Sequence, residues 1–104
     1  MLNWDKLAGF EWDKGNIAKS YQKHGISSRE AEEVFLDESL QILKDVKHSQ
    51  RESRYIAVGK DFSGGIIFIV FTIRNSKVRV ISARPANIKE RQHYEQAVKE
   101  NSTF

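Results

Sequence analysis

Four side chains capable of acid–base or phosphate chemistry lie close together in one polar stretch. Residues 45–54 (DVKHSQRESR) contain Asp45, His48, Glu52 and Arg54. Cleaving RNA without a metal requires a base for the 2′-hydroxyl, an acid for the leaving oxygen, cations for the developing charge and an in-line substrate. Because histidine titrates near neutral pH and glutamate can act as a base, we expect His48 or Glu52 in that role, beside Arg54. The alternative is that His48 is simply exposed in a loop.

Two more cations lie on a predicted strand. Along residues 78–84 (VRVISAR), strict alternation directs Arg79, Ile81 and Ala83 to one side and Arg84 to the other. Arginine beside an apolar strand is costly unless it lines a cleft or meets an anion, and its planar fork suits phosphate. We therefore expect both arginines to bind phosphate. Their alternative partners, inside the fold, are Glu11, Glu52 and Glu90.

The charge distribution also favours a polyanion partner. The net charge is only +3, but residues 29–46 carry two basic and six acidic side chains, whereas residues 74–99 carry seven basic and two acidic ones. A basic half beside an acidic half is typical of proteins that bind a polyanion, although solvated faces have the same composition. Arg74, Lys77 and Arg91 are the further candidates for the basic patch.

Other chemistries have little support. The three histidines are far apart, and no two of them have the i, i+4 spacing of a helical zinc site. Gly64-Gly65 is not followed by the Lys-Ser/Thr pair of a phosphate-binding loop. The chain has no cysteine, which excludes disulfides and thiolate zinc sites. We expect neither a metal nor a cofactor.

The composition is that of one soluble domain spanning residues 1–104. Apolar residues make up 39% and charged residues 30% of the chain, close to globular averages. The longest apolar run, Ile66 to Phe71, is far shorter than the roughly 20 residues that cross a bilayer. The first ten residues lack the apolar core of a secretory signal. We expect a cytoplasmic protein without a membrane partner.

The periodicity predicts an α+β fold. Ser27 and Glu30 form an S-x-x-E capping box ahead of a helix, and Gly25 has the position of a helix-terminating glycine. Residues 66–73 are apolar at nearly every position, which indicates a central strand covered on both faces. Helices are predicted at 13–24, 28–36 and 86–100, and strands at 40–44, 54–60, 66–73 and 78–84, with a short extra strand or docking segment at 10–12.

Short turns between successive strands predict an antiparallel meander with the order α-α-β-β-β-β-α. Two helices precede the sheet and one follows it, and we expect them to pack on one face of the sheet.

Several short motifs, in order along the chain, resemble the BrnT family of toxins. They are Phe10-Glu11-Trp12-Asp13, Lys23-His24-Gly25, Ala31 with Phe35, His48 followed by Glu52-x-Arg54, Arg79-x-Ile81-Ser82-Ala83-Arg84-x-Ala86, Glu90-Arg91 and Tyr94. The resemblance spans residues 10–94. One departure is Ser20, where the family often has asparagine.

The resemblance implies a RelE-like ribonuclease of a type II toxin–antitoxin module that cleaves RNA and inhibits translation. It also implies a BrnA-type antitoxin with a ribbon-helix-helix part, which neutralises the toxin and through which the complex binds DNA. Lys23, His24 and Tyr94 become secondary site candidates, Lys23 and Tyr94 as RNA-binding residues, although His24 also fits a helix-capping role.

Two other functions remain open from the sequence. One is a non-catalytic module, a degenerate family member that binds only its antitoxin or RNA. The other is a protein that binds DNA by itself, which the modest charge and the lack of a helix-turn-helix pattern disfavour.

Overall fold

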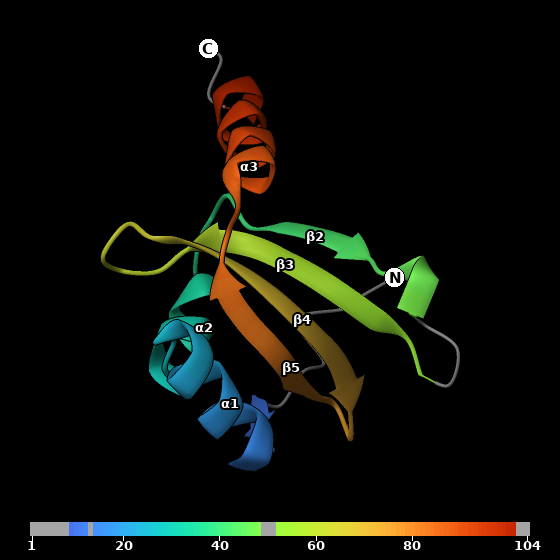
Figure 1. The fold of residues 1–104 in the computed structure, drawn as a ribbon. Helices are drawn as coiled ribbons and strands as arrows, with labels where there is room; N and C mark the ends of the chain where they lie inside the picture. The colour runs from blue at the N-terminus through green and yellow to red at the C-terminus, as the bar shows by residue number, and fades with distance from the viewer. Residues whose placement is uncertain (1–8, 13, 49–51, 102–104) are drawn as a thin grey trace.

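The computed structural model describes residues 9–12, 14–48 and 52–101. Its sheet has the order β1-β5-β4-β3-β2 (Figure 1). Strands β2 to β5 form an antiparallel meander, and β1 adds to β5 in parallel, so the predicted α+β fold is confirmed. The elements are β1 (Phe10–Trp12), α1 (Lys14–His24), α2 (Ser28–Val34), β2 (Gln41–Lys44), the 3-10 helix η2 (Val46–His48), β3 (Arg54–Lys60), β4 (Ile66–Arg74), β5 (Lys77–Pro85) and α3 (Ile88–Asn101).

Helices α1 and α2 cover one face of the sheet and enclose the core. Val34, Ala57, Ile69 and Phe71 are fully buried there. The Phe35 ring packs edge-on against Phe71, with ring centroids 5.2 Å apart. Burial of each large apolar side chain contributes about 1.5–3 kcal/mol, so this layer supplies most of the stabilisation of the fold. Among the described residues, no helix combines the length and apolar character needed to cross a bilayer.

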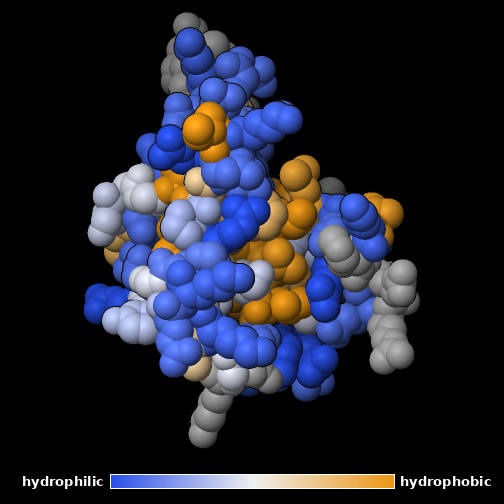
Figure 2. All heavy atoms as spheres, viewed as in Figure 1, coloured by the Kyte–Doolittle hydropathy of each residue, from blue (hydrophilic) through white to orange (hydrophobic). Residues whose placement is uncertain are grey.

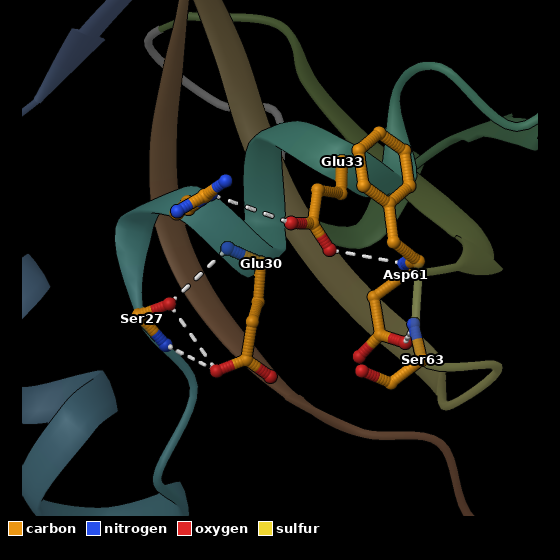
Figure 3. Close-up of polar contacts among 7 residues, drawn as sticks. Ser27, Glu30, Glu33, Asp61 and Ser63 are labelled. Atoms are coloured by element: carbon orange, nitrogen blue, oxygen red, sulfur yellow. Dashed lines mark hydrogen bonds and ion pairs between the residues drawn. The ribbon is translucent and has the colours of Figure 1, made fainter.

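The predicted start of α2 is confirmed in atomic detail (Figure 3). Ser27 Oγ accepts a hydrogen bond from the Glu30 amide at 3.2 Å, and Glu30 Oε1 accepts one from the Ser27 amide at 3.3 Å. On the same helix, Glu33 accepts a hydrogen bond from the Phe62 amide in the β3–β4 turn at 2.9 Å. These contacts satisfy amides at the helix N-terminus and fix α2 against the sheet.

A bulge in β5 changes which residues share a face. Val70 pairs with Ser82 but the next residue, Phe71, pairs with Val80, which leaves Ile81 as an extra residue on β5. One extra residue reverses the alternation of every side chain beyond it. The prediction that Arg79 and Arg84 point to opposite sides is therefore wrong, because strict alternation ends at the bulge.

The bulge places both arginines on the second face, which we define as the sheet face opposite α1 and α2. Arg79 is paired with Thr72, and Arg84 with Phe68. Thr72 and Phe68 alternate with the core residues Phe71 and Ile69 along β4. Ala83 follows the bulge and returns to the core.

Two packing predictions are wrong in the described structure. Helix α3 does not join α1 and α2 but lies against one end of the second face, beside Val58 and Phe68 (Figure 1). Strand β4 is central, as expected, but burial alternates along it: Ile67 and Ile69 are buried, whereas Phe68 is only partly so. The second face is thus apolar without being fully covered by this chain.

Candidate active site

One row of side chains crosses the second face at the end of the sheet that lies away from α3. Strand pairing aligns Arg54 with Thr72, Thr72 with Arg79, and Arg79 with Glu11. Thr72 is buried, and its hydroxyl donates to the Ser53 carbonyl at 2.7 Å. This bond fixes the chain just before Arg54. The row therefore brings together two arginines that are 25 residues apart in sequence.

The adjacent β4–β5 hairpin adds two cations to this row. Arg74 pairs with Lys77 across a tight turn, in which Asn75 and Ser76 have φ of 53° and 61°. Two consecutive left-handed residues give the turn type that matches strand twist. Because side chains two residues apart share a face of the strand, Arg74 lies on the same face as Thr72, and Lys77 on the same face as Arg79.

The predicted catalytic loop starts and ends beside the same row. Its base is closed by the Asp45 amide, which donates to the Arg54 carbonyl at 2.8 Å. Glu52 Oε2 lies 3.3 Å from Arg74 Nη2. The backbone of His48 ends η2, but its side chain and residues 49–51 lie outside the described residues. The structure thus brings Glu52 to the cations and leaves the prediction for His48 open.

Arg79 and Arg84 both form internal ion pairs, as the alternative interpretation of the sequence anticipated. Arg79 Nη1 lies 2.6 Å from Glu11 Oε1, and the two side chains remain 20% and 31% exposed. Arg84 binds Glu90 through two parallel hydrogen bonds of 2.8 Å. Partial exposure leaves both guanidinium groups accessible to a competing anion.

Arg84 is held from two sides. Its guanidinium carbon lies 4.0 Å from the centre of the Phe68 ring, a cation–π contact. The hydrogen bonds with Glu90 raise the pKa of Arg84, against the effect of burial, and the bonds from Arg84 lower the pKa of Glu90. Glu90 also caps α3, because its carboxylate accepts a hydrogen bond from the Asn87 amide at 2.9 Å.

The two arginines lie at different positions along one strand pair. Their partners Thr72 and Phe68 are four residues apart on β4, which corresponds to about 13 Å. Between them is a groove of about 330 Å³, which is lined by Asp45, Arg54, Ile56, Phe68, Val70, Ile81 and Ser82. Arg54 lines the groove directly, and Arg84 stacks on the ring of the lining residue Phe68, so an extended chain in the groove can meet a cation near each end.

The remaining candidates are dispersed. Lys23 is exposed in the last turn of α1, on the covered side of the sheet. Arg91 is exposed in the first turns of α3, one residue after Glu90. His24 is the last residue of α1, and the predicted glycine Gly25 follows it with φ of 69°. Of these three, Arg91 is the one next in sequence to Glu90, the partner of Arg84.

Tyr94 has a structural position that the sequence did not indicate. It is 3% exposed, and its hydroxyl donates to Asp37 Oδ2. Burial, together with the carboxylate, raises the pKa of Tyr94. Burial also raises the pKa of Asp37, but hydrogen bonds from Tyr94, Lys60 and Ser39 outweigh it, so that pKa lies below its usual value. With its hydroxyl held by Asp37 and only 3% of the residue exposed, Tyr94 offers little surface for the predicted RNA contact.

Two contributors were missed by sequence reasoning. Thr72, whose hydroxyl binds the Ser53 carbonyl, is an ordinary strand residue in the sequence. Asp37 lies 57 residues from Tyr94, and no local pattern signals such a pair. Within the described residues, no three histidine or acidic side chains gather as they would around a metal ion.

Comparison with known proteins identifies the family of the chain. A family model described as "Ribonuclease toxin, BrnT, of type II toxin-antitoxin system" matches residues 12–90. A search of curated proteins finds no match. The crystal structure of the Brucella abortus ribonuclease toxin BrnT is similar, with a TM-score of 0.60 and 27% identity over 76% of this chain and 96% of that chain. The chain therefore belongs to the BrnT family of ribonuclease toxins of type II toxin–antitoxin systems.

Proposed function

We propose that this toxin is a metal-independent endoribonuclease that cleaves RNA in the cytoplasm, inhibits translation and is neutralised by a BrnA-type ribbon-helix-helix antitoxin. The observation that carries the proposal is the row of Arg54 and Arg79 on the second face, with Glu52 and Arg74 beside it. This arrangement supplies a carboxylate and several cations at one end of a groove. DNA binding then belongs to the complex with the antitoxin.

Each residue has a role in the proposed reaction. One of Glu52 and His48 takes the proton from the 2′-hydroxyl, whose oxygen attacks the adjacent phosphorus. The bond to the 5′-oxygen breaks, and the other of the two residues gives that oxygen a proton. Arg79 and Arg54, which share one row, stabilise the negative charge of the phosphorane. Arg84 was predicted to share that role, but its strand position is about 13 Å from that of Arg79, so we assign it to a neighbouring phosphate. Lys77, Arg74 and Arg91 hold the neighbouring phosphates. The proposal gives Lys23 and Tyr94 no direct contact with the reacting phosphate.

The internal ion pairs must open before this reaction can occur. A phosphate takes the place of Glu11 on Arg79, and of Glu90 on Arg84, so each guanidinium exchanges one anion for another. Both side-chain pairs are partly exposed, and ion pairs near the surface contribute about 0–1 kcal/mol. The Arg84–Glu90 pair is the stronger of the two, because it is bidentate. A polyanion that contacts several cations at once can supply that free energy.

The decisive experiment measures cleavage of a defined RNA by the purified toxin in the presence of EDTA. Wild type is expected to cleave it, and Arg79→Ala to lose at least roughly a hundredfold in kcat, as when one charge-stabilising group is removed. Arg84→Ala is expected to weaken RNA binding, because it removes a cation that holds a neighbouring phosphate. Lys99→Ala, which removes an exposed cation from the last turn of α3, is the matched control. Loss of cleavage with the chelator would contradict metal independence, and full activity of both arginine variants would contradict the assigned roles.

A second candidate function is a non-catalytic module that binds RNA or the antitoxin. The specific observation in its favour is that Arg79 and Arg84 already have carboxylate partners. It predicts that the purified toxin retains RNA without cutting it and that expression of the toxin alone does not arrest growth. Growth arrest that survives Glu52→Ala, His48→Ala and Arg54→Ala would show that the loop carries no chemistry.

A further inference from the structure

A second groove lies on the same face and does not belong to the proposed active site. It has a volume of about 460 Å³ and runs between the sheet and the whole length of α3. Its helix wall is formed at successive turns from Glu90 to Glu100, about 15 Å along the axis. The apolar lining residues are Leu43, Ile56, Val58, Phe68, Tyr94 and Ala97.

This face carries more apolar side chains than is usual for a sheet face exposed to solvent. Phe68 and Val70 on β4 lie on the uncovered side and are only partly buried, although strands with apolar residues on both faces are normally covered twice. Leu43 on the edge strand β2 is 62% exposed. Figure 2 shows the apolar side chains gathered over β3 and β4, beside the foot of α3. A contiguous exposed apolar surface of this kind marks an interaction site.

The charges along the groove select a protein over RNA as its occupant. Among the described residues that line it, two are carboxylates, Glu90 and Glu100, and none is lysine or arginine. Because Glu90 is already paired with Arg84, the lining offers a phosphate backbone no positive charge. The walls between the two carboxylates combine the apolar side chains with Gln41, His93 and Gln96. Surfaces that bind RNA combine stacking rings with several cations, and those cations are missing from this lining. The lining instead complements an amphipathic peptide segment. Apolar side chains of such a peptide would pack on Leu43 and Ala97, and a basic side chain of the peptide would pair with Glu100.

We propose that the protein antitoxin inserts an amphipathic segment into this groove; the proposal rests on the function proposed above. An occupant of the groove covers Phe68 and Glu90, the two groups that hold Arg84. It thereby keeps Arg84 paired with Glu90 and closes that end of the adjoining RNA groove, which shares Phe68 and Ile56 as walls. Binding of the antitoxin segment would therefore itself block RNA access to the toxin.

The test compares binding and catalysis in groove variants. The probe is the ribbon-helix-helix protein encoded beside the toxin, and its affinity for full-length toxin is measured by isothermal titration calorimetry. Leu43→Asp and Ala97→Glu are expected to weaken binding at least tenfold while free toxin cleaves RNA at the wild-type rate. The matched control is Leu36→Asp, which places the same charge at a leucine that is 71% exposed and outside the groove. It is expected to bind like wild type.

Several outcomes would overturn the proposal. They are antitoxin affinity within twofold of wild type in both groove variants, loss of RNA cleavage in those variants with antitoxin binding intact, and a change only in the oligomeric state of the toxin alone. The second outcome would assign the groove to RNA, and the third to another copy of the chain. If wild-type toxin does not cleave RNA, the proposed function fails, but the antitoxin titration still decides the docking proposal.

Discussion

Replacing Glu11 with glutamine tests whether the Arg79 ion pair competes with RNA. Glutamine has the same shape and can still accept a hydrogen bond from Arg79, so the change removes only the charge. The pair is close, at 2.6 Å, and mostly shielded, which places its contribution in the upper part of the range for surface pairs, about 0.5–1 kcal/mol. Because that amount no longer opposes phosphate binding, RNA affinity is expected to rise roughly two- to fivefold.

The assay is fluorescence anisotropy with a 2′-O-methyl RNA, which binds but cannot be cut, at one fixed salt concentration because phosphate contacts depend on salt. Glu38→Gln removes the same charge in the α2–β2 turn and controls for net charge. Arg79→Ala is expected to weaken binding. The β1–β5 pairing is retained through its backbone bonds, including Val78 to Gly9 at 2.9 Å, so the Glu11 variant stays folded.

Two results would refute the reasoning. If Glu11→Gln weakens binding as much as Arg79→Ala does, Glu11 positions Arg79 for RNA and does not compete with it. If neither variant changes the affinity, RNA does not meet Arg79, and the non-catalytic alternative gains support.

Three further predictions concern stability, each measured by urea unfolding. Tyr94→Phe is expected to lower the free energy of unfolding by about 1.5–3 kcal/mol, because it removes a hydrogen bond to a charged carboxylate; a loss below about 0.5 kcal/mol would contradict a structural role for that bond. The carboxyls of Asp37 and Glu90 have lower pKa values in the folded protein than in the unfolded chain. Both carboxylates therefore stabilise the fold fully at a pH above their unfolded pKa, near 4. This stabilisation is lost as the pH falls through the lower pKa values of the folded state. Over that pH range, the free energy of unfolding of an Asp37→Asn variant should fall less than that of wild type. An equal fall in both proteins would show that Asp37 does not contribute to the pH dependence. Gly59→Ala would bring a new Cβ to 3.0 Å from Val34 Cγ1, and a cost of about 1–3 kcal/mol is expected from overpacking; unchanged stability would mean that α2 shifts freely.

The elements were predictable because their signals are local. Residues 54–60 were expected to form a strand, and β3 has those bounds. The capping box of Ser27 and Glu30 and the glycine at 25 mark ends of α2 and α1 through contacts within four residues. Such signals depend on neighbouring residues alone, so tertiary packing did not override them.

The position of α3 was not predictable for the opposite reason. Its apolar residues are sparse, and its place depends on Tyr94 reaching Asp37 and on Glu90 reaching Arg84. A helical period shows which side of a helix is buried but not which face of a sheet receives it. Without those contacts, the expectation of helices on one face was the natural one, and the groove along α3 could not be foreseen.

The candidate site itself depends on the bulge at Ile81. Arg79 and Arg84 are five residues apart, so in a regular strand they would face opposite sides, and one of them would enter the core beside Val34 and Phe71. The sequence around Ile81 has no glycine or proline to signal an irregularity. Val80 and Ala83 are both buried, and both arginines stay out of the core. This is possible only if the strand has one extra residue between Val80 and Ala83. The Ala83 amide donates to Ser20 Oγ on α1 at 3.3 Å, so the strand after the bulge is fixed to the helix layer. The same packing that excludes the arginines from the core therefore aligns them on the face proposed to meet RNA.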